Sequence, residues 1–186
     1  AQNPIVSRAS AEPEATECKP PPNQAAGEEV AVMTLDKVLR GQVLGSKITF
    51  INGWWPVEKA GLWSGSTQSS IEMKLPRNEG SLELVFGVAM YGTKQRDILL
   101  SFNGKSLGAG KVDEKGTITF DASSLPRGVP LRLQFDAEMP FNNCPLRLGT
   151  GADPRALNFM LKSVELRIGD ATPIQQLTKA SLGSGT

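Results

Sequence analysis

All three tryptophans of the chain, Trp54, Trp55 and Trp63, fall within ten positions, in a glycine-flanked segment that also carries Glu58. Indole rings pack on the C–H faces of sugar rings, and a nearby carboxylate can bond the sugar hydroxyls. Alternatively, the indoles close one end of a core and Glu58 bonds backbone N–H groups or an arginine. We favour burial for Trp63. The adjacent side chains of Trp54 and Trp55 cannot easily both point inward, so we expect one of them to be exposed.

A second group of polar residues begins at Asp136 and Glu138, which stand two apart on an extended segment. Their carboxylates therefore face the same way. Such a pair could act as general acid and base on a glycosidic bond. It could also bind a structural Ca²⁺ together with Asn142 or Asn143. Because two same-face carboxylates more often lie on a solvated sheet face or beside arginines, we expect a protein that is not an enzyme and needs no cofactor.

Two links could hold the long irregular connection that follows Asp136. Cys18 lies in a proline-rich segment and Cys144 in this connection, so a disulfide between them would hold the segment on the domain in an oxidising compartment. In the cytosol both would remain thiols. The even count and the loop placement favour the disulfide. Asp153 and Arg155 precede the last strand, and an ion pair of Arg155 with Asp153 or with Glu58 would fix the loop.

The composition excludes several function classes. The chain has 186 residues, no His, two Cys and a formal net charge of +1. Without His there is no Ser-His-Asp or Cys-His nucleophile system, and two Cys cannot form a four-cysteine metal centre. So small a charge does not gather nucleic acid or an anionic membrane, and no apolar run approaches the ~20 residues of a membrane-spanning helix. We therefore expect no nucleic-acid partner and no direct membrane insertion.

Composition along the chain predicts three regions. Residues 1–29 are acidic and rich in Pro, with too few apolar side chains to repay ordering, which predicts an arm or linker. Residues 30–170 form the expected domain, and 171–186 a small, polar, flexible tail. A chain that opens Ala-Gln-Asn-Pro fits either a mature product of signal-peptide cleavage or a piece of a larger protein.

Hydrophobic residues in the central region repeat with a period of two. This pattern predicts strands at 70–75, 82–90, 98–102, 117–120, 131–136 and 158–168. A change of phase near Lys162 and Ser163 predicts a β-bulge, and Asn103-Gly104 predicts a hairpin turn. The only helical period is a weak one over 34–40. Many short, half-buried strands predict an all-β fold, namely a two-sheet antiparallel β-sandwich of the jelly-roll type.

The order of these features resembles a family of bacterial accessory β-sandwich domains that work beside envelope glycosyltransferases and phosphoglycerol-transferase-like membrane proteins. The matching segments are GWWPVEKAGLWSG, SSIEMKLP, DILLSFNGKSLG and DPRALNFMLKSVELR, within Ile48 to Ile168. The resemblance implies a galactose-binding-like jelly roll and a periplasmic or extracellular, non-catalytic module associated with polysaccharide. The residues that match the family pattern are Trp54, Glu58, Gly61, Trp63, Asp153 and Arg155.

Three hypotheses remain. The first is a carbohydrate-associated module of the bacterial cell envelope that binds polysaccharide or oligosaccharide or assists its synthesis or export, with Trp54 or Trp55 stacking on a sugar and Glu58 and Asn143 as polar contacts. The second is a structural or protein-interaction subunit of an envelope complex, with membrane glycosyltransferase machinery as partner. The third is a glycan-active enzyme that uses Asp136 and Glu138. Jelly rolls host all three roles, so the fold alone does not rank them.

Overall fold

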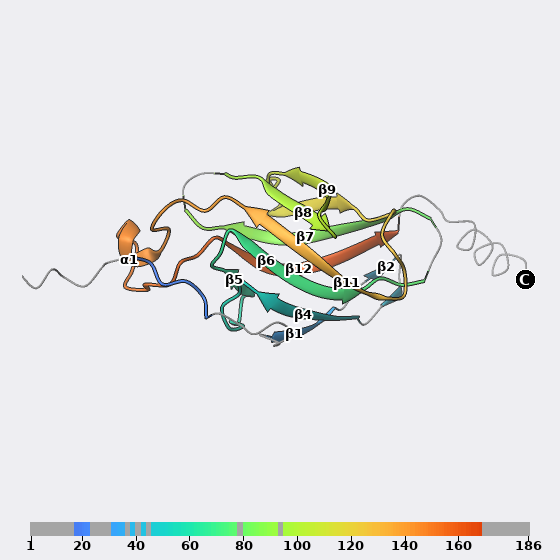
Figure 1. The fold of residues 1–186 in the computed structure, drawn as a ribbon, viewed down its shortest axis with the longest axis horizontal. Coiled ribbons are helices and arrows are strands. Elements are labelled where there is room, and N and C mark those ends of the chain that lie inside the picture. The colour runs from blue at the N-terminus through green and yellow to red at the C-terminus, as the bar shows by residue number, and fades with distance from the viewer. Residues whose placement is uncertain are drawn as a thin grey trace, which may run out of the picture.

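The computed structural model of the protein describes residues 17–22, 31–35, 38–39, 42–43, 46–77, 80–92 and 95–168. The expected boundaries at 29/30 and at 170/171, most of the acidic arm and the whole C-terminal tail lie outside these residues. Within them, the chain builds two antiparallel sheets that pack face to face (Figure 1).

The larger sheet has six strands. Their order across the sheet is β1 (Ala31–Leu35), β4 (Ser46–Asn52), β6 (Gln68–Lys74), β11 (Pro130–Ala137), β8 (Ile98–Phe102) and β9 (Lys105–Gly110). The smaller sheet has the order β10 (Thr117–Asp121), β7 (Leu82–Met90), β12 (Phe159–Ile168) and β5 (Leu62–Ser64). A separate pair joins β2 (Val38–Leu39) to β3 (Gln42–Val43), and the one helix of the described chain is α1 (Pro145–Leu148).

Consecutive strands cross repeatedly between the two sheets, which is the connection pattern of a jelly roll. The strands β4, β6 and β8 belong to the larger sheet, whereas β5 and β7, which lie between them in sequence, belong to the smaller one. The predicted two-sheet antiparallel β-sandwich is therefore confirmed. Each crossover carries the chain over an end of the sandwich, so loops distant in sequence meet there.

The alternating segments fold as predicted, and so do two local irregularities. The pairing of β12 with β7 shifts between Leu161 and Ser163, which is the predicted bulge. Asn103 and Gly104 have φ of 50° and 75°, as a two-residue hairpin turn requires, and they join β8 to β9. The weak helical period over 34–40 was misleading, because Leu35 ends β1 and Val38–Leu39 forms β2.

Aromatic rings fill the space between the sheets at one end of the core. Trp54 packs edge-on against Phe50, Phe159 and Phe135, with centroid distances of 5.0, 5.8 and 6.1 Å. The indole Nε1 of Trp54 donates a hydrogen bond of 2.9 Å to the carbonyl oxygen of Ser70, so its one polar atom is satisfied inside the core. The indole thus joins strands of both sheets.

Several crossovers meet at the end of the sandwich near α1, which we call the α1 end (Figure 1). Backbone hydrogen bonds connect them: Gly65 to Gly53, Tyr91 to Asn158 and Leu157 to Asn143, each 2.9 Å long. The described part of the arm, residues 17–22, also lies at this end, drawn in blue beside the orange loops.

Because Trp54 lies in the core, Trp54→Ala should lower the free energy of unfolding by about 3–5 kcal/mol, measured by chemical denaturation. The control is Val57→Ala in the same segment. Val57 is 59% exposed, and its truncation should change stability by less than about 0.5 kcal/mol. Equal, small effects of the two substitutions would contradict the core position of Trp54.

Candidate functional site

Trp54 and Trp55 are both buried, so the expectation that one of them faces solvent is wrong. Trp54 is 1% exposed and Trp55 is 9% exposed. Both are buried because they are covered by different parts of the chain: Trp54 lies in the core between the sheets, and Trp55 lies under the segment that contains Arg155 and Ala156. Its Nε1 donates to the carbonyl oxygen of Ala156 at 2.8 Å, and the guanidinium of Arg155 lies 5.5 Å from its ring centroid. Neither indole therefore presents an open face to a sugar.

Arg155 forms both of the predicted ion pairs. Its guanidinium bonds Asp153 at 2.8 Å and Glu58 at 2.7 Å. The hydrogen bond to Asp153 is the largest cause that raises the pKa of Arg155, and the hydrogen bond to Glu58 raises it further. The hydrogen bond from Arg155 in turn lowers the pKa of Asp153. The carboxylate of Glu58 is thus held by an arginine, as the structural alternative predicted, and it lines neither of the two surface depressions described below.

Gly61 closes the turn that carries Glu58, and Trp63 follows it in β5. Glu58 and Gly61 exchange backbone hydrogen bonds of 2.9 and 3.2 Å, which close a tight turn. Gly61 has φ of 149°, and a side chain there would collide with the carbonyl group of Leu161. Trp63, expected to be buried, is half-buried, and its ring packs edge-on against Tyr91 with a centroid distance of 5.7 Å.

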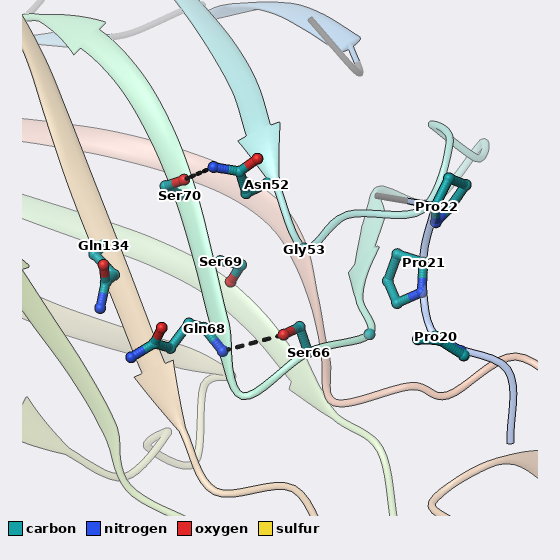
Figure 2. A pocket seen from close by; sticks show the side chains of 11 residues that line it. Pro20, Pro21, Pro22, Asn52, Gly53, Ser66, Gln68, Ser69, Ser70 and Gln134 are labelled. Carbon is teal, nitrogen blue, oxygen red and sulfur yellow. Dashed lines mark hydrogen bonds between the residues drawn. The ribbon is translucent and has the colours of Figure 1, made fainter. Parts of the chain in front are cut away.

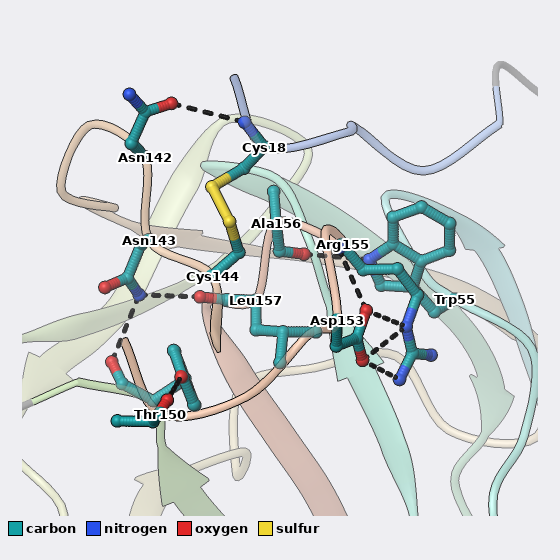
Figure 3. Close-up of a disulfide and its surroundings, with 11 residues drawn as sticks. Cys18, Trp55, Asn142, Asn143, Cys144, Thr150, Asp153, Arg155, Ala156 and Leu157 are labelled. Atoms are coloured by element: carbon teal, nitrogen blue, oxygen red, sulfur yellow. Dashed lines mark hydrogen bonds and ion pairs between the residues drawn. A yellow bond between two sulfur atoms is a disulfide. The ribbon is translucent and has the colours of Figure 1, made fainter. Parts of the chain in front are cut away.

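The predicted disulfide between Cys18 and Cys144 is confirmed (Figure 3). The Cα atoms are 5.9 Å apart, and Cys144 is buried. Backbone pairing continues from the disulfide, because Lys19 donates to the carbonyl of Pro154 at 2.7 Å and accepts from the N–H of Ala156 at 2.8 Å. The arm is therefore fixed on the same segment that covers Trp55.

Asn143 is buried at one wall of an open depression, which we call the Tyr91 hollow. Its volume is about 560 Å³, and it is lined by Tyr91, Gly92, Arg96, Pro140, Asn143, Leu148 and Thr150. Asn143 is 3% exposed, and its Nδ2 donates to the carbonyls of Tyr91 and Leu157. Its Oδ1, drawn in red in Figure 3, accepts no hydrogen bond within the described part of the chain.

Asn158 holds the α1 end together beneath this hollow. Its side chain is fully buried, and its Nδ2 donates to the carbonyls of Ser66 and Ala137 at 3.0 and 2.9 Å. Nη2 of Arg96 donates to both the Oδ1 and the backbone carbonyl of Asn158 at 2.9 Å. Burial lowers the pKa of Arg96, and the charge of Glu138 opposes this shift. Both polar ends of the Asn158 amide are thus used.

Sequence reasoning did not identify Tyr91, the single tyrosine of the chain. It follows the last residue of β7, and its hydroxyl is 2.8 Å from Oγ1 of Thr150. Apart from Gly92 and Arg96, the residues that line the hollow with it lie about 50 to 60 positions downstream. The one available signal was an aromatic residue followed by glycine directly after a predicted strand.

A second depression, the arm groove, lies between the arm and the outer face of the larger sheet (Figure 2). Its volume is about 410 Å³. Pro20, Pro21 and Pro22 form one side, and Gly53, Gly65, Ser66 and Ser69 lie along it. The remaining lining side chains are Asn52, Gln68, Ser70 and Gln134. None of the lining residues carries a formal charge.

Asp136 and Glu138 line neither the Tyr91 hollow nor the arm groove. Asp136 accepts a hydrogen bond of 3.0 Å from Gln134, and Glu138 is exposed beyond the end of β11. In the described part of the chain, no three His, Cys, Asp or Glu side chains gather as a metal site would require. No helix there has the length and apolarity needed to cross a membrane. The catalytic role of the acid pair stays an untested alternative.

No protein-family model and no curated protein matches the chain. Among solved structures, it is similar to the secreted serine protease VesC from Vibrio cholerae, with 16% identity and a TM-score of 0.33, over 63% of this chain and 23% of the protease. It is also similar to the module Xyl-CBM35, solved in complex with a disaccharide containing glucuronic acid, with 18% identity and a TM-score of 0.31. That alignment covers 87% of this chain and 96% of the module. These likenesses are too distant to assign a family.

Replacing both cysteines should destabilise the protein strongly, because the disulfide spans 126 positions. We expect Cys18→Ser/Cys144→Ser to lower the free energy of unfolding by about 4–5 kcal/mol in chemical denaturation. A reducing agent should destabilise the wild type similarly and leave the double variant unchanged. Identical unfolding midpoints for the oxidised wild type and the variant would contradict a stabilising role of the disulfide.

The ion pair between Arg155 and Asp153 predicts a pH-dependent contribution to stability. Because the pKa of Asp153 is lower in the folded state, its contribution is present above its unfolded pKa of about 3.9 and is lost as the pH falls through the folded pKa. Asp153→Asn should therefore be less stable than wild type at pH 7, and the difference should shrink below about pH 4. A difference that is constant from pH 7 to pH 3, measured by urea unfolding, would exclude this contribution.

Proposed function

We propose that the protein is a non-catalytic carbohydrate-binding module and that the Tyr91 hollow holds the ligand. The observation that supports this most strongly is the combination of an aromatic side chain, Tyr91, with a buried amide, Asn143, whose Oδ1 is unpaired within the described residues. Sugar sites commonly join an aromatic ring to a few convergent polar groups.

The lining chemistry suits a ring that is apolar on one face and hydroxylated at its edge. Tyr91, Pro140 and Leu148 supply the apolar surface. Oδ1 of Asn143 can accept a hydrogen bond from a sugar hydroxyl, and Oγ1 of Thr150 can donate or accept one. A volume of about 560 Å³ lies within the range of small-ligand sites.

The backbone of Tyr91 is held firmly before any ligand binds. Its N–H donates to Asn158 at 2.9 Å, and its carbonyl accepts from Arg96 at 3.1 Å and from Asn143 at 3.2 Å. Preorganisation reduces the conformational entropy lost on binding. The hollow therefore has a fixed wall, which is what a binding module requires.

We place this activity in the bacterial cell envelope, with polysaccharide or oligosaccharide as ligand and membrane glycosyltransferase machinery as a neighbouring partner. The support is the sequence resemblance together with the disulfide, since disulfides persist in oxidising compartments such as the periplasm and the extracellular space. The protein would then hold a glycan near the enzymes that make or export it.

A second candidate function, a protein-interaction subunit, is favoured by the loop that carries α1. Phe141, Leu146 and Leu148 are 82%, 45% and 48% exposed within eight positions. Exposed apolar side chains that cluster in this way mark interaction surfaces. Light scattering together with co-purification of membrane partners separates the two functions: a strictly monomeric protein that binds glycan but no protein favours the binding module.

The binding role of Tyr91 is tested by affinity electrophoresis and calorimetry with soluble polysaccharides. Tyr91→Ala should weaken binding at least about tenfold because the ring is lost, whereas Tyr91→Phe, which keeps the ring, should bind nearly as wild type. Leu148→Ala should also weaken binding, and Leu146→Ala is its matched control, since Leu146 is similarly exposed but does not line the hollow. Unchanged binding by a folded Tyr91→Ala protein would reject this site.

A further inference from the structure

We infer that the arm groove is a second binding site, which holds an uncharged carbohydrate chain across the larger sheet. The inference rests on the proposed carbohydrate-binding function for its ligand class. It depends on different side chains, because no residue lines both the arm groove and the Tyr91 hollow.

The chemistry of the groove selects a neutral, hydroxyl-rich ligand. Its polar side chains are three carboxamides and three hydroxyls: Asn52, Gln68, Gln134, Ser66, Ser69 and Ser70. These groups both donate and accept hydrogen bonds, as sugar hydroxyls do. An ionic ligand would lose hydration in the groove without meeting an opposite charge among the lining residues.

The strand register arranges three of these side chains as one row. Asn52 of β4 lies opposite Ser70 of β6, and Ser70 lies opposite Gln134 of β11. Neighbouring strands are about 4.8 Å apart, so the row spans roughly 10 Å perpendicular to the strands. That is the scale of a short oligosaccharide. Figure 2 shows these side chains together on one face of the sheet, with Gln68 beside them.

Gln68 and Gln134 have bonding capacity left for a ligand. Gln68 is exposed, and its carboxamide makes no hydrogen bond within the described part of the chain. Gln134 donates through Nε2 to Asp136 at 3.0 Å, which leaves its Oε1 as an acceptor. Oγ of Ser69 is buried without a partner among the described residues, and such groups are commonly satisfied by an ordered water, so it is not counted among the groups that reach a ligand.

The arm completes the groove with a stiff apolar wall. Pro20, Pro21 and Pro22 begin two positions after Cys18 of the disulfide, and their rings fix the backbone φ angles. Gly65 allows this wall to lie close, because a Cβ at Gly65 would come 2.7 Å from the ring of Pro21. Proline rings offer apolar faces to the C–H side of a sugar, while the amides across the groove face its hydroxyls.

The sheet topology argues against an extended peptide as the occupant. Peptides that add to a sheet bind the free backbone groups of an edge strand. The strands β4, β6 and β11 each have a neighbour on both sides, so they are interior strands. The groove thus offers side chains rather than a free backbone edge.

The test uses the full chain and affinity electrophoresis in gels that contain a soluble neutral β-glucan, mannan or galactan. One of these polysaccharides should retain the wild type. The Gln68→Ala/Gln134→Ala variant should bind that polysaccharide at least about tenfold more weakly than the wild type does. The matched control is Glu72→Gln/Arg132→Gln, which changes a facing pair on the same two strands outside the groove, and should bind as wild type. Unchanged binding by the Gln68/Gln134 variant, or wild-type binding only to acidic polysaccharides or peptides, would overturn the inference.

Tyr91→Ala in the same gels separates this inference from the proposed function. If binding falls with the Gln68/Gln134 variant and not with Tyr91→Ala, the groove is supported and the Tyr91 hollow is rejected. The reverse result rejects the groove and keeps the hollow. Weaker binding by both variants supports two subsites. If none of the polysaccharides retains the wild type, the groove is rejected as a site for neutral glycans.

Discussion

One buried side chain, Asn158, connects the parts of the α1 end on which both depressions depend. Its amide bonds Ser66 beside the arm groove, Ala137 at the end of β11 and Arg96 in the Tyr91 hollow. Its backbone carbonyl also accepts from the N–H of Tyr91. A buried amide is stable only when its donors and acceptor are used, so these groups hold one another in place. Three interstrand connections, β5–β6, β7–β8 and β11–β12, are thereby joined into one surface.

A second layer lies outside this amide and is fixed by covalent and ionic bonds. The Cys18–Cys144 disulfide and the Arg155 ion pairs hold the arm and the 153–156 segment over Trp55. The tryptophan-rich loop thus serves the fold, and the surface that it supports carries the side chains with free bonding capacity. In keeping with this division, Glu58 and Asp153 both bond Arg155.

The sequence alone was informative wherever burial on one face of a strand determined the pattern. It predicted six of the longer strands, the bulge near Ser163 and the hairpin at Asn103-Gly104, because these depend on local alternation and turn chemistry. It did not identify β9, whose sequence KSLGAG is rich in glycine and has weak strand propensity. It also predicted the disulfide and the partners of Arg155, because few other pairings were available.

The candidate sites were harder to predict because their residues meet only in three dimensions. Trp55 is buried by Ala156, about 100 residues away, and nothing local to the tryptophans indicates that cover. Tyr91 and Asn143 come from different crossovers. The arm resembled a tail by composition, so its proline wall could not be placed before the disulfide fixed it.

We propose that carbohydrate binds at the α1 end of the sandwich, where these bonds hold the loops before any ligand is present. The most direct measurement is a titration of the ¹⁵N-labelled protein with a neutral oligosaccharide, followed by amide chemical shifts. We expect perturbations at Tyr91 and Thr150 in the hollow and at Gln68 and Ser70 in the groove, with the amides of β9 and β10 unchanged. Perturbations confined to the exposed loop around Phe141, or none at saturating sugar, would contradict it.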